Sequence, residues 1–299
     1  EVPGYRYFRL SLEQPVDHGD PAGEQFSQRM TLLHRDGGAP LVVSTEGYFL
    51  FNYQGLSEPA NLLHGNQLTV EHRMFAGSVY VDDDWSTLTI EQAAGDHHRI
   101  VEALQSCYSG PRIATGASKG GMTASYFRRF YPDDVDVTTP YVAPLSYDPI
   151  DSRSIEFVDA VGDPACRDAL RDAQRELLLR RPAMLQRMQS QAQQDGYTYE
   201  LLGEDFVLEV MALEMPFTFW QYFDASLCSA VPSPAASDAE LWDFYDEVMP
   251  ASSVHDQRLL AYEPYFWQAS VQLGAPGIDE TGLADLLMFP GGDVPSAFV

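Results

Sequence analysis

Residues 113–122 read Ile113-Ala114-Thr115-Gly116-Ala117-Ser118-Lys119-Gly120-Gly121-Met122. This stretch holds a Gly-x-Ser-x-Gly sequence, with apolar residues before it and a segment of helical character, residues 123–130, after it. The pattern is typical of a nucleophile elbow, in which a strand ends, the chain turns sharply and a serine sits at the apex before a helix begins. It predicts a strand over 113–115, a strained backbone at Ser118 and an α/β fold.

Ser118 is the candidate catalytic nucleophile. A serine hydroxyl is a poor nucleophile on its own, so it needs a base and an oxyanion site. The backbone N–H of Lys119, at the start of the expected helix, would supply one oxyanion donor. We expect the second donor from Gly47 or Tyr48, in the loop after the strand expected at 41–45. Lys119 is the only lysine in the chain, and its place directly after the serine argues against the alternative, a glycine-rich turn with a solvated serine.

The composition argues against several classes of function. The chain has 299 residues and a formal net charge of −26 at pH 7, which opposes binding to phosphate backbones, so we expect no nucleic-acid partner. Apolar runs fall short of the ~20 residues that a membrane span needs, so we expect no membrane partner. The three cysteines fit no metal motif, and we expect no metal or cofactor. The chain begins at Glu1 without a signal-like segment, so we expect its start to be processed or cut.

The first half of the chain alternates strand and helix patterns. Strand-like runs lie at 5–12, 26–34, 41–45, 66–72, 113–115 and 135–144. The first two are expected to pair antiparallel across a polar turn. Residues 90–108 carry apolar positions at helical spacing. This order predicts an α/β fold with a mainly parallel sheet.

The pattern changes after about Tyr147. Helical segments are expected over 163–194, 204–223, 238–249 and 259–273. We interpret residues 1–146 as the N-terminal part of a core that carries the elbow, 147–275 as an all-helical cap inserted into it, and 276–299 as a truncated return segment toward the core.

Motifs along nearly the whole chain carry a family resemblance. Beyond the elbow they are Gln14-Pro15-Val16-Asp17-His18, residues 28–35, Thr45-Glu46-Gly47-Tyr48, residues 70–73, 88–94 and 96–100, Phe130-Tyr131-Pro132, Tyr141-Val142-Ala143-Pro144, residues 215–220 and residues 268–274. Together they resemble the bacterial prolyl tri- and tetrapeptidyl aminopeptidases, serine peptidase family S37. A weaker likeness to lysosomal Pro-X carboxypeptidase, of family S28, rests on Glu71-His72-Arg73, residues 88–94 and the elbow.

The resemblance implies an α/β-hydrolase core, a helical cap over the site and a Ser–Asp–His triad. It also implies a secreted serine exopeptidase that releases tri- or tetrapeptides from free N-termini, with a proline preference near the cut and an acyl-enzyme on Ser118. Two alternatives stay open, namely an esterase or acyltransferase of the same fold and a catalytically inactive peptide-binding module.

The chain departs from the family pattern in its catalytic acid and base. In this fold the acid and the histidine follow the serine along the chain, and His255 is the only histidine after Ser118. We therefore expect the acid and base outside these 299 residues, on a C-terminal fragment of the same precursor. The competing interpretation makes His255, within the expected cap, the base.

The histidines before the elbow favour structural roles. His97 and His98 lie on the helix expected over 90–108, and adjacent helical residues point about 100° apart, so they cannot chelate one ion together. For residues 71–73, an ion pair between Glu71 and Arg73 that holds the loop is favoured over catalysis.

Substrate contacts follow from the resemblance. It places cap aromatics over the nucleophile, where a proline ring could stack, and these are Phe217, Trp220 and Trp267. An aminopeptidase must also bind the peptide's α-ammonium, and carboxylates are the usual partners. Glu46 and Glu214 are the candidates, because both lie inside matched motifs.

The cysteines are predicted to behave differently from one another. Cys166 and Cys228 both lie in the expected cap, near helix ends and beside loops, and export favours oxidation, so we predict a disulfide between them. Cys107 is expected on the apolar face of the helix before the elbow, as a buried free thiol.

Overall fold

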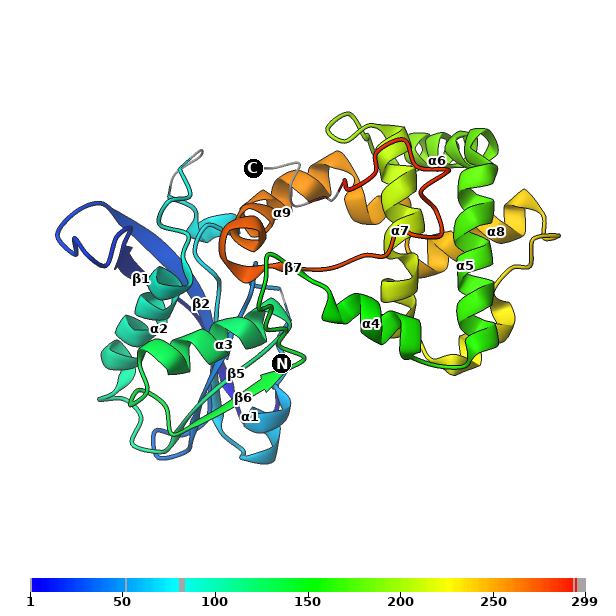
Figure 1. Cartoon of the computed structure of the whole chain (residues 1–299). Helices are drawn as coiled ribbons and strands as arrows, with labels where there is room; N and C mark the ends of the chain where they lie inside the picture. The colour runs from blue at the N-terminus through cyan, green and yellow to red at the C-terminus, as the bar shows by residue number, and fades with distance from the viewer. Residues whose placement is uncertain (1, 52, 81–83, 293, 295–299) are drawn as a thin grey trace. The chain divides into compact units, whose positions relative to one another are not determined.

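The computed structural model describes residues 2–51, 53–80, 84–292 and 294. The chain divides into two compact units, Glu1–Leu145 and Ser146–Val299, and Figure 1 shows the elements of each. The return segment expected over 276–299 runs partly outside the described residues.

The first unit is built on a mixed sheet. Within the described residues its strands are β1 (Arg6–Pro15), β2 (Gln25–His34), β3 (Leu41–Thr45), β4 (Asn66–Val70), β5 (Arg112–Ala117) and β6 (Val137–Tyr141). Their spatial order is β1-β2-β4-β3-β5-β6. The pairs β1–β2 and β2–β4 are antiparallel, whereas β3–β4, β3–β5 and β5–β6 are parallel. Every expected strand of this half is present, and the parallel part is the one that ends in the elbow.

Helices cover both faces of this sheet. The helices α2 (Ile90–Leu104) and α3 (Lys119–Phe130) lie side by side on one face, where Leu41 and Val43 are buried (Figure 1). Residue 42 points the other way, because side chains alternate along a strand, and Val42 packs with Ala60 of the short helix α1 (Glu58–Leu62). Buried apolar side chains on both faces of β3 explain why residues 41–43 of this strand form a continuous apolar run.

The helix α2 is shorter than the sequence predicts, and this corrects the expectation for Cys107. The side chain of Thr89 caps α2 by accepting a hydrogen bond from the Gln92 N–H, but the helix ends at Leu104 rather than near residue 108. Cys107 therefore lies in the turn after the helix instead of on its apolar face, and it is a free, exposed thiol.

The second unit is mainly helical. Its described elements are α4 (Arg153–Ala160), α5 (Pro164–Leu179), α6 (Arg181–Asp195), α7 (Glu204–Tyr222), α8 (Asp238–Val248), α9 (Asp256–Gln268), a π-helix at Ala269–Leu273, 3₁₀ turns at Ala225–Ala230 and Ala251–Val254, and the paired short strands β7 (Ile150–Asp151) and β8 (Ala275–Pro276). The single helix expected over 163–194 is two helices, which meet at Arg180. Pro182 stands in the first turn of α6, and its missing N–H is tolerated there but not in a helix interior.

The helix α7 is the centre of this unit. It is buried on most sides, from Val207 to Phe219, although Pro216 stands inside it. A proline cannot donate to the carbonyl four residues earlier, which belongs to Ala212. The Gln174 side chain of α5 supplies the missing donor, with Nε2 2.8 Å from the Ala212 carbonyl.

The predicted disulfide is confirmed. Cys166 of α5 is bonded to Cys228, which lies in the 3₁₀ turn at Ala225–Ala230. The bridge closes a sequence separation of 62 residues. By the loop-entropy argument, a cross-link of this span stabilises a fold by about 4 kcal/mol.

Candidate active site

The elbow has the geometry that its sequence predicts. The strand β5 ends at Ala117, Ser118 has φ +52° and ψ −125°, and α3 begins at Lys119. A non-glycine residue with positive φ costs of the order of 1–3 kcal/mol and persists only where its surroundings hold it. Here the Ser118 N–H donates to the carbonyl of Tyr141 at the end of β6, at 3.0 Å. The Ser118 side chain is exposed, so the hydroxyl is presented at the C-terminal edge of the parallel strands.

The end of β3 closes tightly against this turn. Thr45 Oγ1 donates toward the carbonyls of Thr115, at 3.1 Å, and Gly120, at 2.7 Å. A Cβ added at Gly120 would lie 2.4 Å from the Thr45 carbonyl oxygen, so no side chain fits there. This contact explains the second glycine of the Gly-x-Ser-x-Gly sequence and brings the loop after β3 up to the start of α3.

That loop, residues 46–50, lies directly against the first turn of α3. A Cβ on Gly47 would be 2.6 Å from Lys119 Cβ and 2.8 Å from the Gly120 nitrogen. The loop is also held from the β4 side, because the Glu46 N–H donates to Val70 and the His72 N–H donates to the Tyr48 carbonyl, both at 3.0 Å. The expected oxyanion donors, from Lys119 and from Gly47 or Tyr48, are therefore on backbone segments in contact.

Lys119 is buried, which its charge makes unusual. Its side chain reaches back to the loop, and Nζ donates to the Gly47 carbonyl at 2.7 Å. Nζ also lies over the rings of Tyr48 and Phe75, at 5.5 and 5.4 Å from their centroids. Burial holds the pKa of this amine well below its ordinary value. Among the described residues no carboxylate forms an ion pair with it.

The expected pair between Glu71 and Arg73 is wrong. Glu71 receives both Nε and Nη2 of Arg29, at 2.9 and 2.6 Å. Arg29 lies on β2, where its carbonyl accepts from the Glu71 N–H, so the two side chains are cross-strand neighbours. The other bonds to the Glu71 carboxylate come from the Ser78 hydroxyl, at 2.7 Å, and the Leu50 N–H, at 3.0 Å. Glu71 thus anchors the far end of the 46–50 loop.

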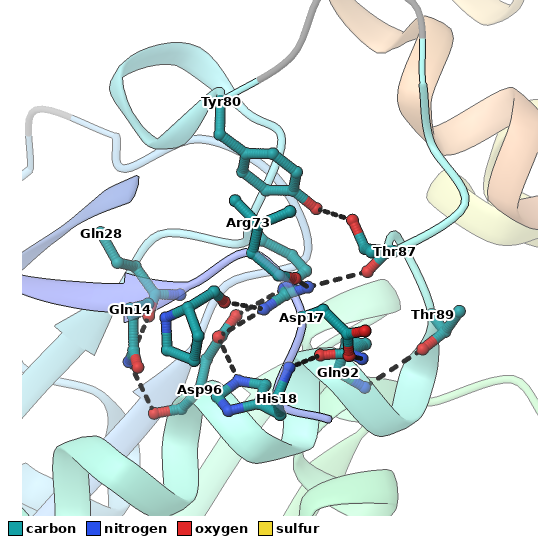
Figure 2. A network of polar contacts seen from close by, with 12 residues as sticks. Gln14, Asp17, His18, Gln28, Arg73, Tyr80, Thr87, Thr89, Gln92 and Asp96 are labelled. Carbon is teal, nitrogen blue, oxygen red and sulfur yellow. Dashed lines mark hydrogen bonds and ion pairs between the residues drawn. The ribbon is translucent and has the colours of Figure 1, made fainter. Parts of the chain in front are cut away.

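Arg73 instead joins a buried network on α2, shown in Figure 2. Its Nε and Nη2 contact the two carboxylate oxygens of Asp96 at 2.8 and 2.7 Å, and both side chains are fully buried. Nη1 donates to the carbonyls of Val16 and Thr87, and the His18 ring contacts the same carboxylate at 2.8 Å. Arg73 and Asp96 thus connect three segments: the turn after β1, the segment after β4, and α2. Their role is structural.

The histidines on α2 also make structural contacts. His98 Nδ1 lies 2.7 Å from an Asp134 carboxylate oxygen, and the ring stacks on Tyr131. His97 is buried against Phe127, and its Nδ1 has no hydrogen-bond partner in the described part of the chain. Desolvation lowers the pKa of His97 to about 4, so the ring is neutral near pH 7.

Glu46, the first candidate for binding the peptide's α-ammonium, lies at the start of the 46–50 loop. It follows β3 directly and is partly buried. Desolvation raises the pKa of its carboxyl group to about 7. Its side chain makes no hydrogen bond or ion pair within the described residues, and a cationic ligand would lower this pKa by favouring the charged form.

The other candidate residues belong to the second unit. Phe217 and Trp220 of α7 line a cavity of about 190 Å³ with Leu170 and Leu213. Glu214 lies three residues before Phe217 on α7, and Trp267 lies on α9. Burial and then the charge of Glu214 raise the pKa of Tyr265, so these two side chains are neighbours. The site residues thus form two groups: Glu46, Gly47, Tyr48, Ser118 and Lys119 in the first unit, and Glu214, Phe217, Trp220 and Trp267 in the second.

His255, the alternative base, caps a helix. Its ring nitrogen accepts from the Arg258 N–H, 3.3 Å away, at the start of α9, and the ring stacks on Tyr197. Both neighbours belong to the second unit.

In the part of the chain that the structure describes, no cluster of histidine, cysteine or carboxylate side chains could hold a metal ion. The described helices also include none with the length and apolar character to cross a membrane.

The sheet, the elbow after β5 and the helix that follows define an α/β-hydrolase core. Residues 1–299 match the family described as PS-10 peptidase S37, and the chain belongs to this family.

The chain is similar to several proteins of known name. The chain is 43% identical over 298 residues to the prolyl tri/tetrapeptidyl aminopeptidase of Streptomyces mobaraensis, covering 99% of this chain and 62% of that protein. It is 31% identical over 160 residues to the lysosomal Pro-X carboxypeptidase of Mus musculus, covering 47% of this chain and 33% of the relative. Among solved structures, oligopeptidase B from Trypanosoma brucei is similar with a TM-score of 0.35 and 14% identity, over 48% of this chain and 21% of that one. The chain thus spans less than two thirds of the length of these relatives.

Sequence reasoning identified the elbow but missed the contacts that support it. The Thr45 hydroxyl bonds the elbow carbonyls, the Glu71 carboxylate and the His72 N–H hold the 46–50 loop, and Asp96 holds Arg73. A sequence signal existed for the first three, because they directly follow or end expected strands at the edge where the elbow lies. Asp96 could not be found, because its partner is set by how α2 packs on the sheet.

Proposed function

We propose that the protein is a serine exopeptidase that releases tri- or tetrapeptides from free peptide N-termini, with a proline preference near the cut. The observation that carries the proposal is the exposed Ser118 hydroxyl, held at positive φ between β5 and α3. Membership of the S37 peptidase family and the name of the Streptomyces relative support the choice of a peptide bond as substrate.

The proposed reaction proceeds through an acyl-enzyme. Ser118 Oγ attacks the carbonyl carbon before the scissile bond while a general base takes its proton. The negative charge that develops on the carbonyl oxygen is bound by the backbone N–H of Lys119 and a second N–H from Gly47 or Tyr48. The released amine takes the proton from the base, and water then attacks the ester on Ser118 to free the N-terminal tri- or tetrapeptide.

We propose that the acid and base come from outside these 299 residues, on a C-terminal part of the same precursor. Within the described residues, no histidine or carboxylate is hydrogen-bonded to the Ser118 side chain. The one histidine that follows the serine, His255, is engaged in capping α9 and stacking on Tyr197.

Substrate binding is assigned to both units. Glu46 is proposed to pair with the α-ammonium of the peptide, because it is a desolvated carboxylate without a partner in the described residues, next to the oxyanion loop. Glu214 is the second candidate for this role. Phe217, Trp220 and Trp267 are proposed to contact the proline ring, within a helical cap at 147–275 followed by a return segment at 276–299.

Secretion is proposed from the disulfide. The Cys166–Cys228 bridge suits an oxidising, extracellular compartment. Peptides are the proposed partners.

The test uses the full-length protein and chromogenic peptides that end in proline p-nitroanilide. Tripeptide and tetrapeptide forms with a free N-terminus should be cleaved, and N-acetylated copies should not. Ser118→Ala should abolish the turnover. Turnover of p-nitrophenyl esters without any peptide cleavage would instead identify an esterase. Peptide binding without turnover would identify an inactive binding module.

A further inference from the structure

We propose that the Lys119 side chain is a positioning residue for the oxyanion site and that it aims the Tyr48 N–H. This inference rests on the proposed function and deepens it. The mechanism above leaves Gly47 and Tyr48 as alternatives for the second donor, and the contacts of Lys119 decide between them.

One peptide plane joins Gly47 to Tyr48. The carbonyl of Gly47 and the N–H of Tyr48 belong to one planar, trans peptide unit, so they point in opposite directions. Lys119 Nζ holds the carbonyl end at 2.7 Å. Fixing one end of a rigid plane fixes the other, and the direction of the Tyr48 N–H is therefore set by Lys119.

The same peptide unit is restrained along the chain. The Tyr48 carbonyl accepts from the His72 N–H at 3.0 Å, and the Glu46 N–H donates to the Val70 carbonyl at 3.0 Å. These two bonds hold the chain on either side of the Gly47–Tyr48 plane, and the bond from Lys119 Nζ holds the plane itself.

Lys119 also strengthens the donor that it aims. A hydrogen bond accepted by the carbonyl oxygen polarises the amide and makes its N–H a better hydrogen-bond donor. The buried setting strengthens this effect, because Lys119 is 3% exposed and a hydrogen bond is electrostatically stronger away from water. The rings of Tyr48 and Phe75 enclose Nζ, at 5.5 and 5.4 Å from their centroids.

Lys119 would thereby determine both hydrogen-bond donors of the oxyanion site. The backbone N–H of Lys119 is the first, at the start of α3, and its side chain orients the second. A purely structural tether would stabilise the free enzyme and the transition state equally. A positioning residue instead acts where negative charge develops, so it affects kcat more than KM.

The experiment compares two variants in the full-length protein. Lys119→Met keeps an unbranched side chain, one atom shorter than lysine and suited to burial, but removes the donor. Thr123→Val is the matched control, because Thr123 is also buried in the first turns of α3 and its hydroxyl donates to the Lys119 carbonyl at 2.9 Å. Within the described residues it makes no hydrogen bond to the 46–50 loop. Lys119→Arg is the second variant, in case the methionine side chain prevents folding.

For Lys119→Met we expect kcat to fall about 10²- to 10³-fold, the usual effect of losing one oxyanion donor, with KM within about threefold. A peptide boronic acid, which forms a tetrahedral anion on the serine, should lose affinity by the same factor as kcat/KM. Lys119→Arg should recover part of the loss, and Thr123→Val should leave kcat within about threefold. A kcat for Lys119→Met within threefold of wild type, or a loss confined to KM, would overturn the proposal.

A second readout does not depend on turnover. With ¹⁵N-tyrosine labelling, the Tyr48 amide resonance should move in Lys119→Met and stay in place in Thr123→Val, since only the first variant releases the Gly47 carbonyl. An unmoved Tyr48 amide would refute the orientation by itself. If wild type shows no Ser118-dependent turnover, the proposed peptidase function fails, while the amide shift still decides the role of Lys119.

Discussion

Asp96→Asn should destabilise the first unit strongly. The substitution preserves the shape of the side chain but removes the charge that Arg73 faces in Figure 2. Both side chains of this pair are 0% exposed, so the Arg73 guanidinium would stay buried without a counter-charge. Breaking one partner of a buried ion pair costs about 3–5 kcal/mol. The new amide group would also point an N–H toward hydrogen-bond donors of Arg73 or His18, and this clash between donors would lower the stability further.

The matched control is Asp159→Asn in the second unit. Asp159 pairs with Arg171 at 2.9 Å, and the two side chains are 46% and 50% exposed. Exposed pairs contribute about 0–1 kcal/mol because water screens them. The structure therefore predicts a difference of about 3 kcal/mol between two substitutions of identical chemistry.

Urea unfolding gives the free energy of unfolding of each variant, and hydrogen exchange measured on peptides of α2 and β2 assigns the loss to the first unit. Exchange in α5 and α7 should not change for Asp96→Asn. We would reject the argument from burial if Asp96→Asn lowered the free energy of unfolding by less than about 1 kcal/mol, or if the two variants lowered it equally.

Three further outcomes are expected. In the unfolded state His97 binds a proton with the ordinary histidine pKa of 6.5, whereas in the folded state its pKa is about 4. The free energy of unfolding should therefore fall as the pH drops from 6.5 to 4, by up to about 3 kcal/mol. His97→Gln should flatten this part of the pH profile measured by urea unfolding, and an unchanged profile would contradict the prediction. A thiol reagent without reductant should label Cys107 alone in the folded protein and should gain no site in urea, because Cys166 and Cys228 are bonded; three labelled cysteines would refute the bridge. His255→Ala should retain near-normal peptidase activity in the full-length protein, whereas complete loss would make His255 the base.

The sequence predicts those parts of the fold that depend on local pattern. The run 41–45 and the Gly-x-Ser-x-Gly turn are specified by neighbouring residues, so β3, β5 and the start of α3 follow directly. The cysteine pair was also recognisable, because both members lie next to loops of the helical segment.

The errors concern features that depend on packing or on exact helix ends. Cys107 was expected to be buried because the apolar spacing continues to Tyr108, but the last turn of α2 is replaced by a turn that exposes the thiol. Glu71 was given the wrong partner because an ion pair depends on the register between β2 and β4, which places Arg29 beside it. A pattern in one segment carries no information about which neighbouring strand will lie opposite.

The proposed mechanism requires Ser118 to be an activated nucleophile. It is tested most directly by treating the full-length protein with a fluorophosphonate and locating the adduct by mass spectrometry, alongside turnover of the proline p-nitroanilide peptides by Ser118→Ala. We predict one adduct, on the peptide that contains Ser118, and a loss of about 10⁴- to 10⁶-fold in turnover for the variant. An adduct on another serine, or a Ser118→Ala variant with activity within tenfold of wild type, would contradict the account.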